Sequence, residues 1–216
     1  MANDYLAMQD RIADEVRAAS SAASSDIASQ IKLAIQSAIS SYQNESFYFN
    51  EGSFTFQTVN GQEYYTSSDN SEIPNILSFL DVRITVNNTT YPLTARTFQY
   101  IDQIQTNTGY TGDPVDYCTW AQQIRLYPIP FTARTVTVSY IKNLTILSAD
   151  TDTNAWMTGN AEQLIRGRAK WDLYLNTLKD PENAQASKLY ELDAYKSLLG
   201  ETVGRQSTDA IRPTQF

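Results

Sequence analysis

Residues 122–144, QQIRLYPIPFTARTVTVSYIKNL, decide the fold class of this chain. Apolar and polar residues alternate on both sides of a Pro-x-Pro corner, which predicts two short β-strands. Pro128 and Pro130 end the first strand, because proline cannot donate to a strand ladder. From about residue 156 the apolar residues instead recur at the three- and four-residue spacing of helices. The chain therefore combines strands and helices, and we assign it to the α+β class.

Helical spacing marks both ends of the chain. Residues 4–18 and 27–42 each carry one apolar stripe, with Asn3 as a cap for the first helix and Ser25 or Asp26 for the second. Near the other end, Asp180-Pro181 stops one helix and starts the next, which we expect to end at Gly200. The stripes consist of Tyr5, Met8, Ile12 and Val16; Ile27, Ile31, Ile35 and Ile39; Leu164, Ile165, Ala169, Leu175 and Leu178; and Leu189, Leu192, Tyr195 and Leu199. Four such stripes are satisfied most simply in a four-helix bundle.

The middle of the chain alternates with period two. Asn60-Gly61 lies between two strand-like runs and predicts a β-hairpin, and Asn87-Asn88 predicts a second turn. One face of the later strands is apolar: Leu80, Val82, Ile84 and Val86; Cys118, Trp120, Ile124 and Leu126; and Val136, Val138 and Tyr140. We predict a β-sandwich or barrel-like module inserted into the helical bundle. The predicted division is a bundle of 1–45 and 149–200, a β module of 46–148, and an extended C-terminal arm of 201–216.

The amino-acid composition argues against most catalytic, metal-binding and nucleic-acid-binding functions. The chain has no histidine, one cysteine and a formal net charge of −8. It therefore lacks Ser-His-Asp and Cys-His systems, zinc clusters and the basic footprint of a nucleic-acid-binding protein. Cys118 lies in a strand-like run, where a buried thiol is expected. No apolar run approaches the roughly 18 residues of a membrane span. We predict no catalytic residue, no metal, no cofactor and no membrane partner.

The acidic segment SADTDTN at 148–154 allows three interpretations. Carboxylates could serve in glycoside hydrolysis, which needs two of them facing each other about 5–10 Å apart in a cleft. The segment could also bind calcium weakly, but it lacks the spacing and the terminal Glu of a calcium loop. Asp and Asn just before a helix also cap its exposed N–H groups. We favour capping, and we predict that the protein is not an enzyme.

Three stretches carry a resemblance to a known family. They are DIASQIKLAIQSAISSYQNESFYFNEGSFTFQTVNGQEYY, IRLYPIP and DTDTNAWMTGNAEQLIRGRAKWDLYLNTLKDPENA. Together they resemble the head–tail adaptor (connector) proteins of tailed bacteriophages over most of residues 26–200. The resemblance implies a helical bundle with a β insertion and a ring of about a dozen copies beneath the portal. It also implies a C-terminal tail that docks on the portal, and a place in the neck of the virion after assembly in the host cytoplasm.

A ring of this kind has further partners. A tail or nozzle protein would lie below it, and DNA would pass through its lumen without specific binding. Acidic side chains lining that lumen would repel DNA, although the same acids could equally form ordinary solvated surface. An alternative function is a carbohydrate- or receptor-binding β module of a phage tail protein, which would display Trp120 and several Tyr on one open face.

The C-terminal arm holds the predicted portal contacts. Its basic and acidic residues balance, so it can approach a partner without the repulsion expected of the acidic body. Its apolar residues offer anchors, and proline lowers the entropy lost on ordering. A terminus without consequence is the competing interpretation. The predicted contact residues are Arg205, Ile211, Arg212, Pro213 and Phe216.

Overall fold

The computed structural model describes residues 4–19, 26–108, 110–144, 147–157 and 159–207. The chain forms two compact units, each described here by itself: a helical unit of Met1–Asn50 with Leu144–Phe216, and a β unit of Glu51–Asn143. The prediction of a mixed α+β protein is confirmed, and the finer term of a four-helix bundle stays a prediction.

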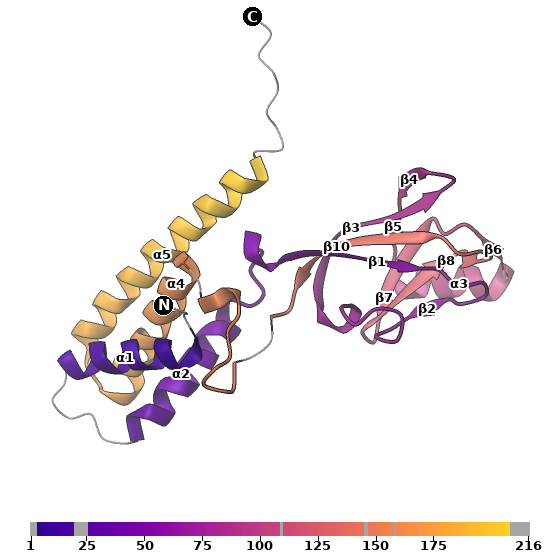
Figure 1. Ribbon diagram of the computed structural model, residues 1–216. Coiled ribbons are helices and arrows are strands. Elements are labelled where there is room, and N and C mark those ends of the chain that lie inside the picture. Colours follow the sequence, from indigo (N-terminus) through magenta and orange to yellow (C-terminus); the bar gives the residue numbers. More distant parts are fainter. Residues whose placement is uncertain (1–3, 20–25, 109, 145–146, 158, 208–216) are drawn as a thin grey trace, which may run out of the picture. The chain divides into compact units, whose positions relative to one another are not determined.

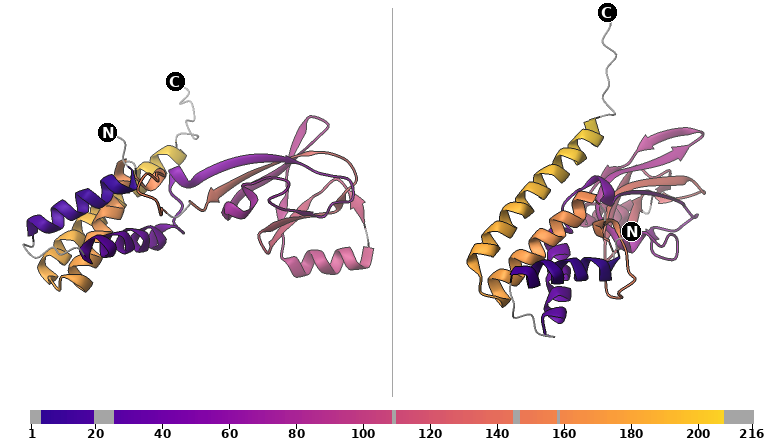
Figure 2. Two further views of the ribbon diagram at one scale, coloured as in Figure 1. Left: turned by 60° about the horizontal axis from the view of Figure 1, so that its bottom comes forward. Right: turned by 60° about the vertical axis from the view of Figure 1, so that its left-hand side comes forward.

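The helical unit is built from four long helices around one core. They are α1 (Tyr5–Ala19), α2 (Asp26–Tyr42), α4 (Gly159–Asp172) and α5 (Pro181–Ser207), and α4 continues into a π-helical turn, η4 (Leu173–Thr177). The stripes predicted for α1 and α2 face this core, where Tyr5, Ile12 and Ile35 are fully buried. A short helix, η3 (Ala155–Met157), adds Trp156 to the same core. In Figure 2 (right), α4 lies between α5 and α2, in agreement with its contacts to both helices.

Side-chain caps fix where two of these helices begin. The Asp4 carboxylate accepts the N–H of Ala7 at 2.8 Å, so Asp4 caps α1, while Asn3 lies outside the described residues. The Asp180 carboxylate accepts the N–H of Asn183 at 3.1 Å, and Pro181 takes the first helical position, as the sequence predicts. The predicted caps Ser25 and Asp26 of α2 have no described side chains.

Along the chain, the boundaries between the two units fall after Asn50 and after Asn143, which is inside the predicted β module of 46–148. Residues 46–50 and 144–148 were assigned to the strands, but Phe47 and Leu147 are buried in the helical core. Phe47 packs edge-on against Trp156, with ring centroids 5.8 Å apart, and Tyr48–Asn50 form a short helix, η1. The aromatic residues at 47–49 favour a strand by propensity, but their rings complete the core of the helices.

The last helix is longer than predicted. Gly200 does not end α5, which continues to Ser207. The reason lies two residues later, where Thr202 is buried and its hydroxyl donates to the Leu198 carbonyl at 2.9 Å. The Thr202 oxygen also accepts the Tyr48 N–H at 3.4 Å. The predicted arm of 201–216 is therefore helical in its first part, and residues 208–216 lie outside the described residues.

The β unit has two four-stranded sheets that share one core. The first has the order β1 (Glu51–Gln57), β10 (Thr135–Lys142), β3 (Ile76–Val86) and β4 (Thr89–Pro92). The second has the order β2 (Tyr64–Tyr65), β8 (Gln123–Tyr127), β7 (Asp116–Trp120) and β5 (Thr94–Ala95). Two short strands, β6 (Thr111–Gly112) and β9 (Ile129–Pro130), pair in parallel, and a helix, α3 (Phe98–Thr108), packs against β7. Val136 and Val138 of β10 and Ile124 and Leu126 of β8 are fully buried, as their alternation predicts.

Two turn predictions had different outcomes. Asn87 and Asn88 both adopt positive φ and join β3 to β4, so the predicted turn is confirmed. Asn60-Gly61 does form a turn, with Gly61 at φ +79, but no hairpin follows, because β1 pairs with β10 and β2 pairs with β8. The Gly61 N–H donates instead to the Pro130 carbonyl at 2.8 Å.

Two residues of the predicted apolar face are exposed. Between Ser139 and Tyr140 the register of β10 on β3 shifts by one residue, so Tyr140 opposes Phe79 and not Leu80. A shift of one residue moves a side chain to the other face of the strand, and Leu80 is 55% exposed. Trp120, at the end of β7, is 58% exposed.

Candidate interaction surfaces

The acidic segment at 148–154 holds the backbone in place. One oxygen of the Asp152 carboxylate accepts the N–H groups of Ser148 and Ala149, both at 2.8 Å. Those backbone hydrogen bonds lower the pKa of Asp152. The Asn154 side chain accepts the Trp156 N–H at 2.9 Å at the start of η3. The Asn154 contact is a helix cap of the kind that we favoured, whereas Asp152 binds backbone N–H groups of the turn that precedes the helix.

Metal ligands, the cysteine thiol and the apolarity of the helices are described next. In the part of the chain that is described, no group of three or more His, Cys, Asp or Glu side chains is placed to hold a metal ion. Burial raises the pKa of the Cys118 thiol, so the buried thiol that the sequence predicts is confirmed and has little thiolate character. Among the described helices, none is long and apolar enough to cross a membrane.

The apolar stripe predicted for α5 is divided: Tyr195 and Leu199 pack against the core, whereas the two leucines before them lie on the outward side of the helix. Leu189 and Leu192 are 59% and 42% exposed, and Val203, two turns beyond Lys196, is 62% exposed. We call Leu189, Leu192, Lys196 and Val203 the α5 outer face. The face of α5 turned to the core is instead made of small and polar residues, with a single large aliphatic one: Ala184, Ser187, Glu191, Ala194, Leu198 and Thr202. The predicted burial of Leu189 and Leu192 is therefore wrong.

A close approach of two helices explains the buried face of α5. A Cβ atom on Gly167 of α4 would lie 3.0 Å from the backbone Cα and N of Glu191. Backbones this close leave room for Ala and Ser between the helices but not for Leu. Leu189 and Leu192 consequently lie outside this contact and are exposed. The sequence signal was present in the spacing of Ala184, Ser187, Ala194 and Gly167, but apolarity alone selects the wrong stripe.

Glu191 is a fully buried carboxylate at this contact. It accepts a hydrogen bond from the Tyr42 hydroxyl of α2, and the Lys188 ammonium lies 2.9 Å from its other oxygen. The Arg168 guanidinium of α4 lies 3.7 Å away. Burial and the bond to Glu191 raise the pKa of Tyr42. A buried charge costs stability unless it is paired, and here three helices supply the partners.

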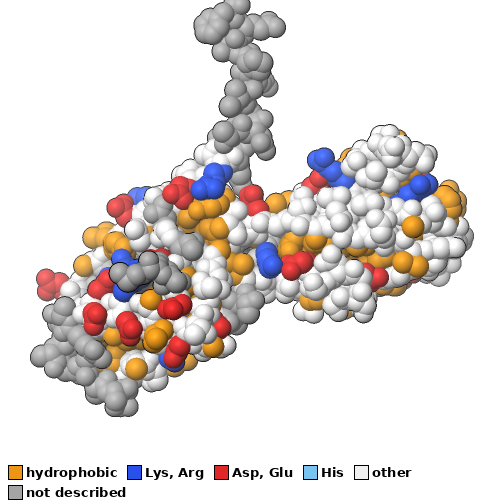
Figure 3. All heavy atoms as spheres, viewed as in Figure 1, with side chains coloured by type: hydrophobic (Ala, Val, Ile, Leu, Met, Phe, Trp, Pro, Cys, Tyr) orange, Lys and Arg blue, Asp and Glu red, His pale blue; other side chains and the backbone are white. Residues whose placement is uncertain are grey.

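The exposed side of α1 is acidic. Leu6, Asp10 and Asp14 recur every fourth residue on the side opposite the buried stripe, and the half-buried Ala13 lies beside them. We call these four residues the α1 acidic face. Figure 3 shows red carboxylate side chains gathered over α1. Within the described ranges, neither Asp10 nor Asp14 has a basic side chain within ion-pair distance.

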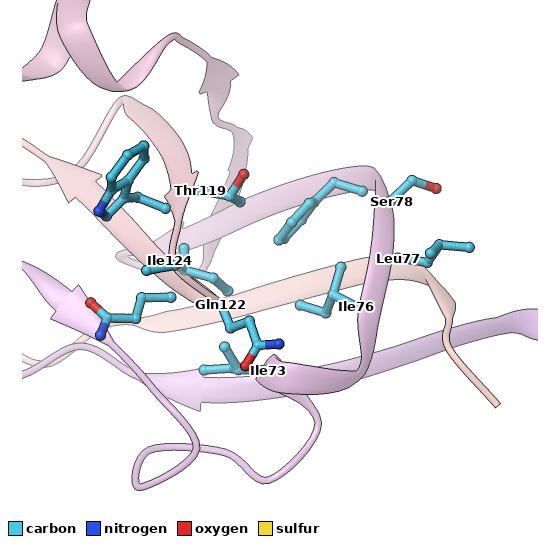
Figure 4. Close-up of a pocket in the computed structure, with 11 residues that line it drawn as sticks. Ile73, Ile76, Leu77, Ser78, Thr119, Gln122 and Ile124 are labelled. Carbon is cyan, nitrogen blue, oxygen red and sulfur yellow. The ribbon is translucent and has the colours of Figure 1, made fainter. Parts of the chain in front are cut away.

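A hollow in the β unit lies beside an exposed tryptophan. Its volume is about 380 Å³, and β3, η2 (Ile73–Asn75) and the β7–β8 hairpin form its walls. Figure 4 shows Ile73, Ile76 and Ile124 converging in the hollow, with Gln122 reaching over from the turn. The Trp120 ring packs on Phe98 of α3, with centroids 4.8 Å apart. The residues that line the hollow are apolar or neutral and polar, and none of them is charged.

The turn that presents Trp120 has an unusual sequence. Ala121 and Gln122 both have positive φ, at 49 and 59. A two-residue hairpin needs this geometry, but Asn and Gly adopt it far more readily than Ala or Gln. Such strain persists only where neighbouring structure holds it. Phe98 is held by the Arg125 guanidinium, 4.9 Å from its ring.

Arg125 is fixed in turn by its acidic partners. Its guanidinium donates to the Glu63 carboxylate and, at 3.3 Å, to Asp102 of α3. Burial alone would lower the pKa of Arg125, but the hydrogen bond and charge of Glu63 outweigh it and raise the pKa. The support beneath Trp120 is thus a buried, fully paired cation.

The comparison with known families decides what class of protein carries these surfaces. The family model of the SU10 adaptor protein matches residues 3–215. The chain belongs to the SU10 adaptor protein family. No curated protein matches the sequence. The adaptor is a structural component of a bacteriophage virion, and the resemblance to head–tail adaptor proteins is confirmed.

The predicted portal contacts of the adaptor divide into two groups. Arg205 lies in the last turn of α5, where its guanidinium carbon is 3.8 Å from the centroid of the Tyr48 ring. Ile211, Arg212, Pro213 and Phe216 lie outside the described residues. Arg205 therefore has a partner within its own helical unit, which the reading of 201–216 as an extended arm missed. The α5 outer face and the α1 acidic face were not recognised as surfaces from the sequence.

Proposed function

We propose that the adaptor forms a ring of about a dozen copies between the portal and the tail, in the neck of the virion. The observation that carries the proposal is the family match over residues 3–215, nearly the whole chain. A ring component needs a rigid body, lateral contacts and a docking element. The shared core of the helices supports the first, and the apolar α5 outer face supports the second.

The docking element in this proposal is the segment after α5, with Ile211, Pro213 and Phe216 as apolar anchors for the portal and Arg212 as a polar contact. Arg205 orients the segment, because its contact with Tyr48 fixes the end of α5. The tail-side partner would lie on the opposite side of the ring. DNA would pass through the lumen without specific binding, since the chain carries a net charge of −8.

Truncation tests this docking element. A chain that ends at Ser207 keeps Thr202 and Arg205 and should melt like the full-length adaptor. It should nevertheless fail to join portal-containing heads. A chain that ends at Gly200 is a poor test, because it removes the buried Thr202 and destabilises the body as well. Wild-type occupancy of heads by the chain ending at Ser207 would show that the body carries the portal contact.

The ring itself is tested by mass measurement of the purified adaptor, alone and after addition to isolated portal. We expect a single closed species of about a dozen copies in at least one of these samples. A protein that stays monomeric in both, and that does not add to heads, would contradict the ring proposal.

A second candidate function, saccharide binding by the β unit, is favoured by one specific observation. Trp120 is 58% exposed beside a hollow lined by Gln122, Gln123, Thr119 and Ser78. An aromatic face and neutral amide and hydroxyl groups suit the apolar faces and hydroxyl groups of a neutral sugar. Binding to an array of neutral oligosaccharides should then be lost in Trp120→Ala and kept in the control Tyr110→Ala, since Tyr110 is equally exposed but does not line the hollow. Absence of binding by the wild-type protein would end this candidate.

A further inference from the structure

We propose that a polar pocket in the helical unit binds a carboxylate group. The pocket has a volume of about 410 Å³ and lies where α1, the end of α4 and the first turns of α5 come together. The residues that line it are Glu15, Lys170, Tyr174, Asn183, Ala186, Ser187 and Tyr190. The inference concerns a site within one chain, so it does not depend on the proposed ring.

The geometry of the helix changes at this pocket. In the π-helical turn η4, the Leu178 N–H donates to the carbonyl of Leu173, five residues earlier, at 2.9 Å. Such turns are rare and are frequent at functional sites. Tyr174 belongs to this turn, and it is the residue of the turn that lines the pocket.

Two buried hydroxyl groups of the pocket have no hydrogen-bond partner. Tyr174 is 5% exposed and Ser187 is 6% exposed, and within the described ranges neither side chain makes a hydrogen bond. Burial, together with the nearby charges of Asp180 and Glu15, raises the pKa of Tyr174, so its hydroxyl keeps its proton. A buried hydroxyl without a partner lowers stability, and a ligand that accepts from both hydroxyls would recover that loss.

Two further side chains add donors to the pocket. The Tyr190 hydroxyl accepts a hydrogen bond from the Arg166 guanidinium at 2.8 Å, which leaves its own proton free to donate. The Lys170 ammonium lies 2.6 Å from Oε2 of Glu15, but the two groups are not aligned as a hydrogen bond. Its three N–H groups therefore remain available as donors. The donors that line the pocket are Lys170, Tyr174, Ser187 and Tyr190.

The carboxylate of Glu15 does not exclude an anion, because cations already hold it. The Lys170 ammonium lies 2.6 Å from it and the Arg166 guanidinium 3.6 Å. Arg166 also lies 3.5 Å from Glu162, which has Arg11 at 2.6 Å as a second partner. Three cations and two carboxylates form this network, so one positive charge is left to attract a ligand with a single negative charge.

The remaining acid near the pocket favours a carboxylate over a phosphate. Asp180 accepts the N–H of Asn183 at 3.1 Å and its amide at 2.7 Å, at the N-terminus of α5, where the helix dipole offsets a negative charge. A phosphate dianion would face both Asp180 and Glu15. A carboxylate carries one charge and two oxygens, which suit the single ammonium of Lys170 and the hydroxyls beside it.

Titration of the full-length protein with sodium acetate tests the site, against sodium chloride at equal ionic strength. Acetate should stabilise the wild type against urea more than chloride does, because it binds only the folded protein. Its effects on amide NMR shifts should concentrate at residues 170–174 and 183–190. Lys170→Gln should weaken acetate binding at least tenfold, and Tyr174→Phe and Ser187→Ala should each weaken it about fivefold.

Matched controls separate binding from folding. Tyr174→Phe removes a hydroxyl without a partner, so the variant without acetate should be as stable as the wild type. Tyr5→Phe removes a hydroxyl that donates to the Lys32 carbonyl at 3.1 Å, so it should lose stability but still bind acetate. Lys196→Gln removes an exposed lysine elsewhere on α5 and should bind acetate like the wild type. Equal effects of acetate and chloride on the wild type overturn the inference, as does wild-type acetate binding by both Lys170→Gln and Tyr174→Phe.

The carboxylate has two possible sources, a free small molecule or an acidic side chain of another protein subunit. Occupancy of portal-containing heads distinguishes them. If a subunit supplies the carboxylate, Tyr174→Phe should reduce occupancy and acetate should compete with the wild type. If the ligand is free, occupancy should stay unchanged in both cases. Should the wild type itself fail to join heads, the proposed function fails, and the acetate titration still decides whether the pocket binds a carboxylate.

Discussion

Helices α2 and α5 belong to one helical unit but distribute their residues in opposite ways. α2 buries Ile31, Ile35 and Ile39 and turns serine, glutamine and a single leucine, Leu33, to the outside. α5 buries Ala184, Ser187 and Glu191 and turns leucines to the outside. Helix α2 is stabilised by the burial of large apolar side chains. Helix α5 is stabilised by a close backbone approach to α4 and by a buried carboxylate that is paired.

The difference teaches that the burial of a helix face depends on its neighbour as well as on its own composition. Gly167 sets the distance between α4 and α5, and at that distance the leucines of α5 have no room. They remain available for a surface outside the unit, as expected for a chain that functions in an assembly. Four substitutions test how far this contrast extends, in descending order of their effect on the stability of the helical unit.

The largest loss in the free energy of unfolding is expected for a substitution in α2. Ile35→Asp places an unpaired carboxylate at a fully buried site and should lower the free energy of unfolding by about 4 kcal/mol or more. The control Leu33→Asp, on the exposed side of the same helix, should change it by less than about 0.5 kcal/mol. Urea unfolding followed by circular dichroism gives both values. Equal stability of the two variants would show that α2 is not packed through Ile35.

The next effect links α2 to α5 through Tyr42 and Glu191. Tyr42→Phe leaves the buried carboxylate short of one donor and should cost about 1.5–3 kcal/mol near neutral pH. Burial and Glu191 raise the pKa of Tyr42 above its ordinary value of 10.0. A raised pKa in the folded state favours the neutral phenol, so this contribution is complete below about pH 10 and is lost as the pH rises further.

Unfolding of the wild type and Tyr42→Phe by urea at several pH values measures that loss. The gap in stability between the two proteins should narrow from about pH 10 upward, because only the wild type carries the phenol. Other buried tyrosines ionise equally in both proteins and cancel in the difference. A gap that stays constant to the highest pH studied would argue against the bond to Glu191.

A smaller effect is expected at the contact between α4 and α5. Gly167→Ala brings a methyl group within 3.0 Å of the Glu191 backbone and should cost about 1–3 kcal/mol. Gly200→Ala is the control, because nothing lies within 4 Å of its added Cβ in the exposed part of α5. That change should raise stability by about 0.5–1 kcal/mol through helix propensity. A gain in stability from both changes would mean that the helices are farther apart than the structure shows.

Sequence periodicity predicted the parts of the fold where local pattern and packing agree. The stripe of α1, the Asp180-Pro181 boundary, the turn at Asn87-Asn88 and the buried side of β10 all follow from residue spacing. In each of these elements the local sequence specifies the backbone conformation, and the rest of the fold adds only burial. The α+β class and the adaptor family followed from the same signals and from resemblance.

The predictions that were wrong share one cause. In each case the conformation depends on a residue that is distant in the sequence. Residues 47–49 resemble a strand because aromatic residues are enriched in strands, but Phe47 lies in the helical core against Trp156, more than a hundred residues away. Leu80 is exposed because β10 shifts register opposite it. Gly200 does not end α5 because Thr202 is buried against Tyr48. No window of the local sequence contains both members of these pairs.

The smallest effect on stability is expected at the α5 outer face, and it gives the sharpest form of the contrast with α2. Leu192→Gln keeps helix propensity nearly constant and removes an exposed apolar side chain. The free energy of unfolding of the isolated chain should therefore change by less than about 0.5 kcal/mol, whereas the same kind of change at Ile35 is severe. The measurement must be made at a concentration where the wild type is monomeric, because association would stabilise it and mimic a folding defect. A loss above about 1 kcal/mol under those conditions would mean that Leu192 packs within its own unit, and the α5 outer face would then have to be redrawn around Leu189 and Val203.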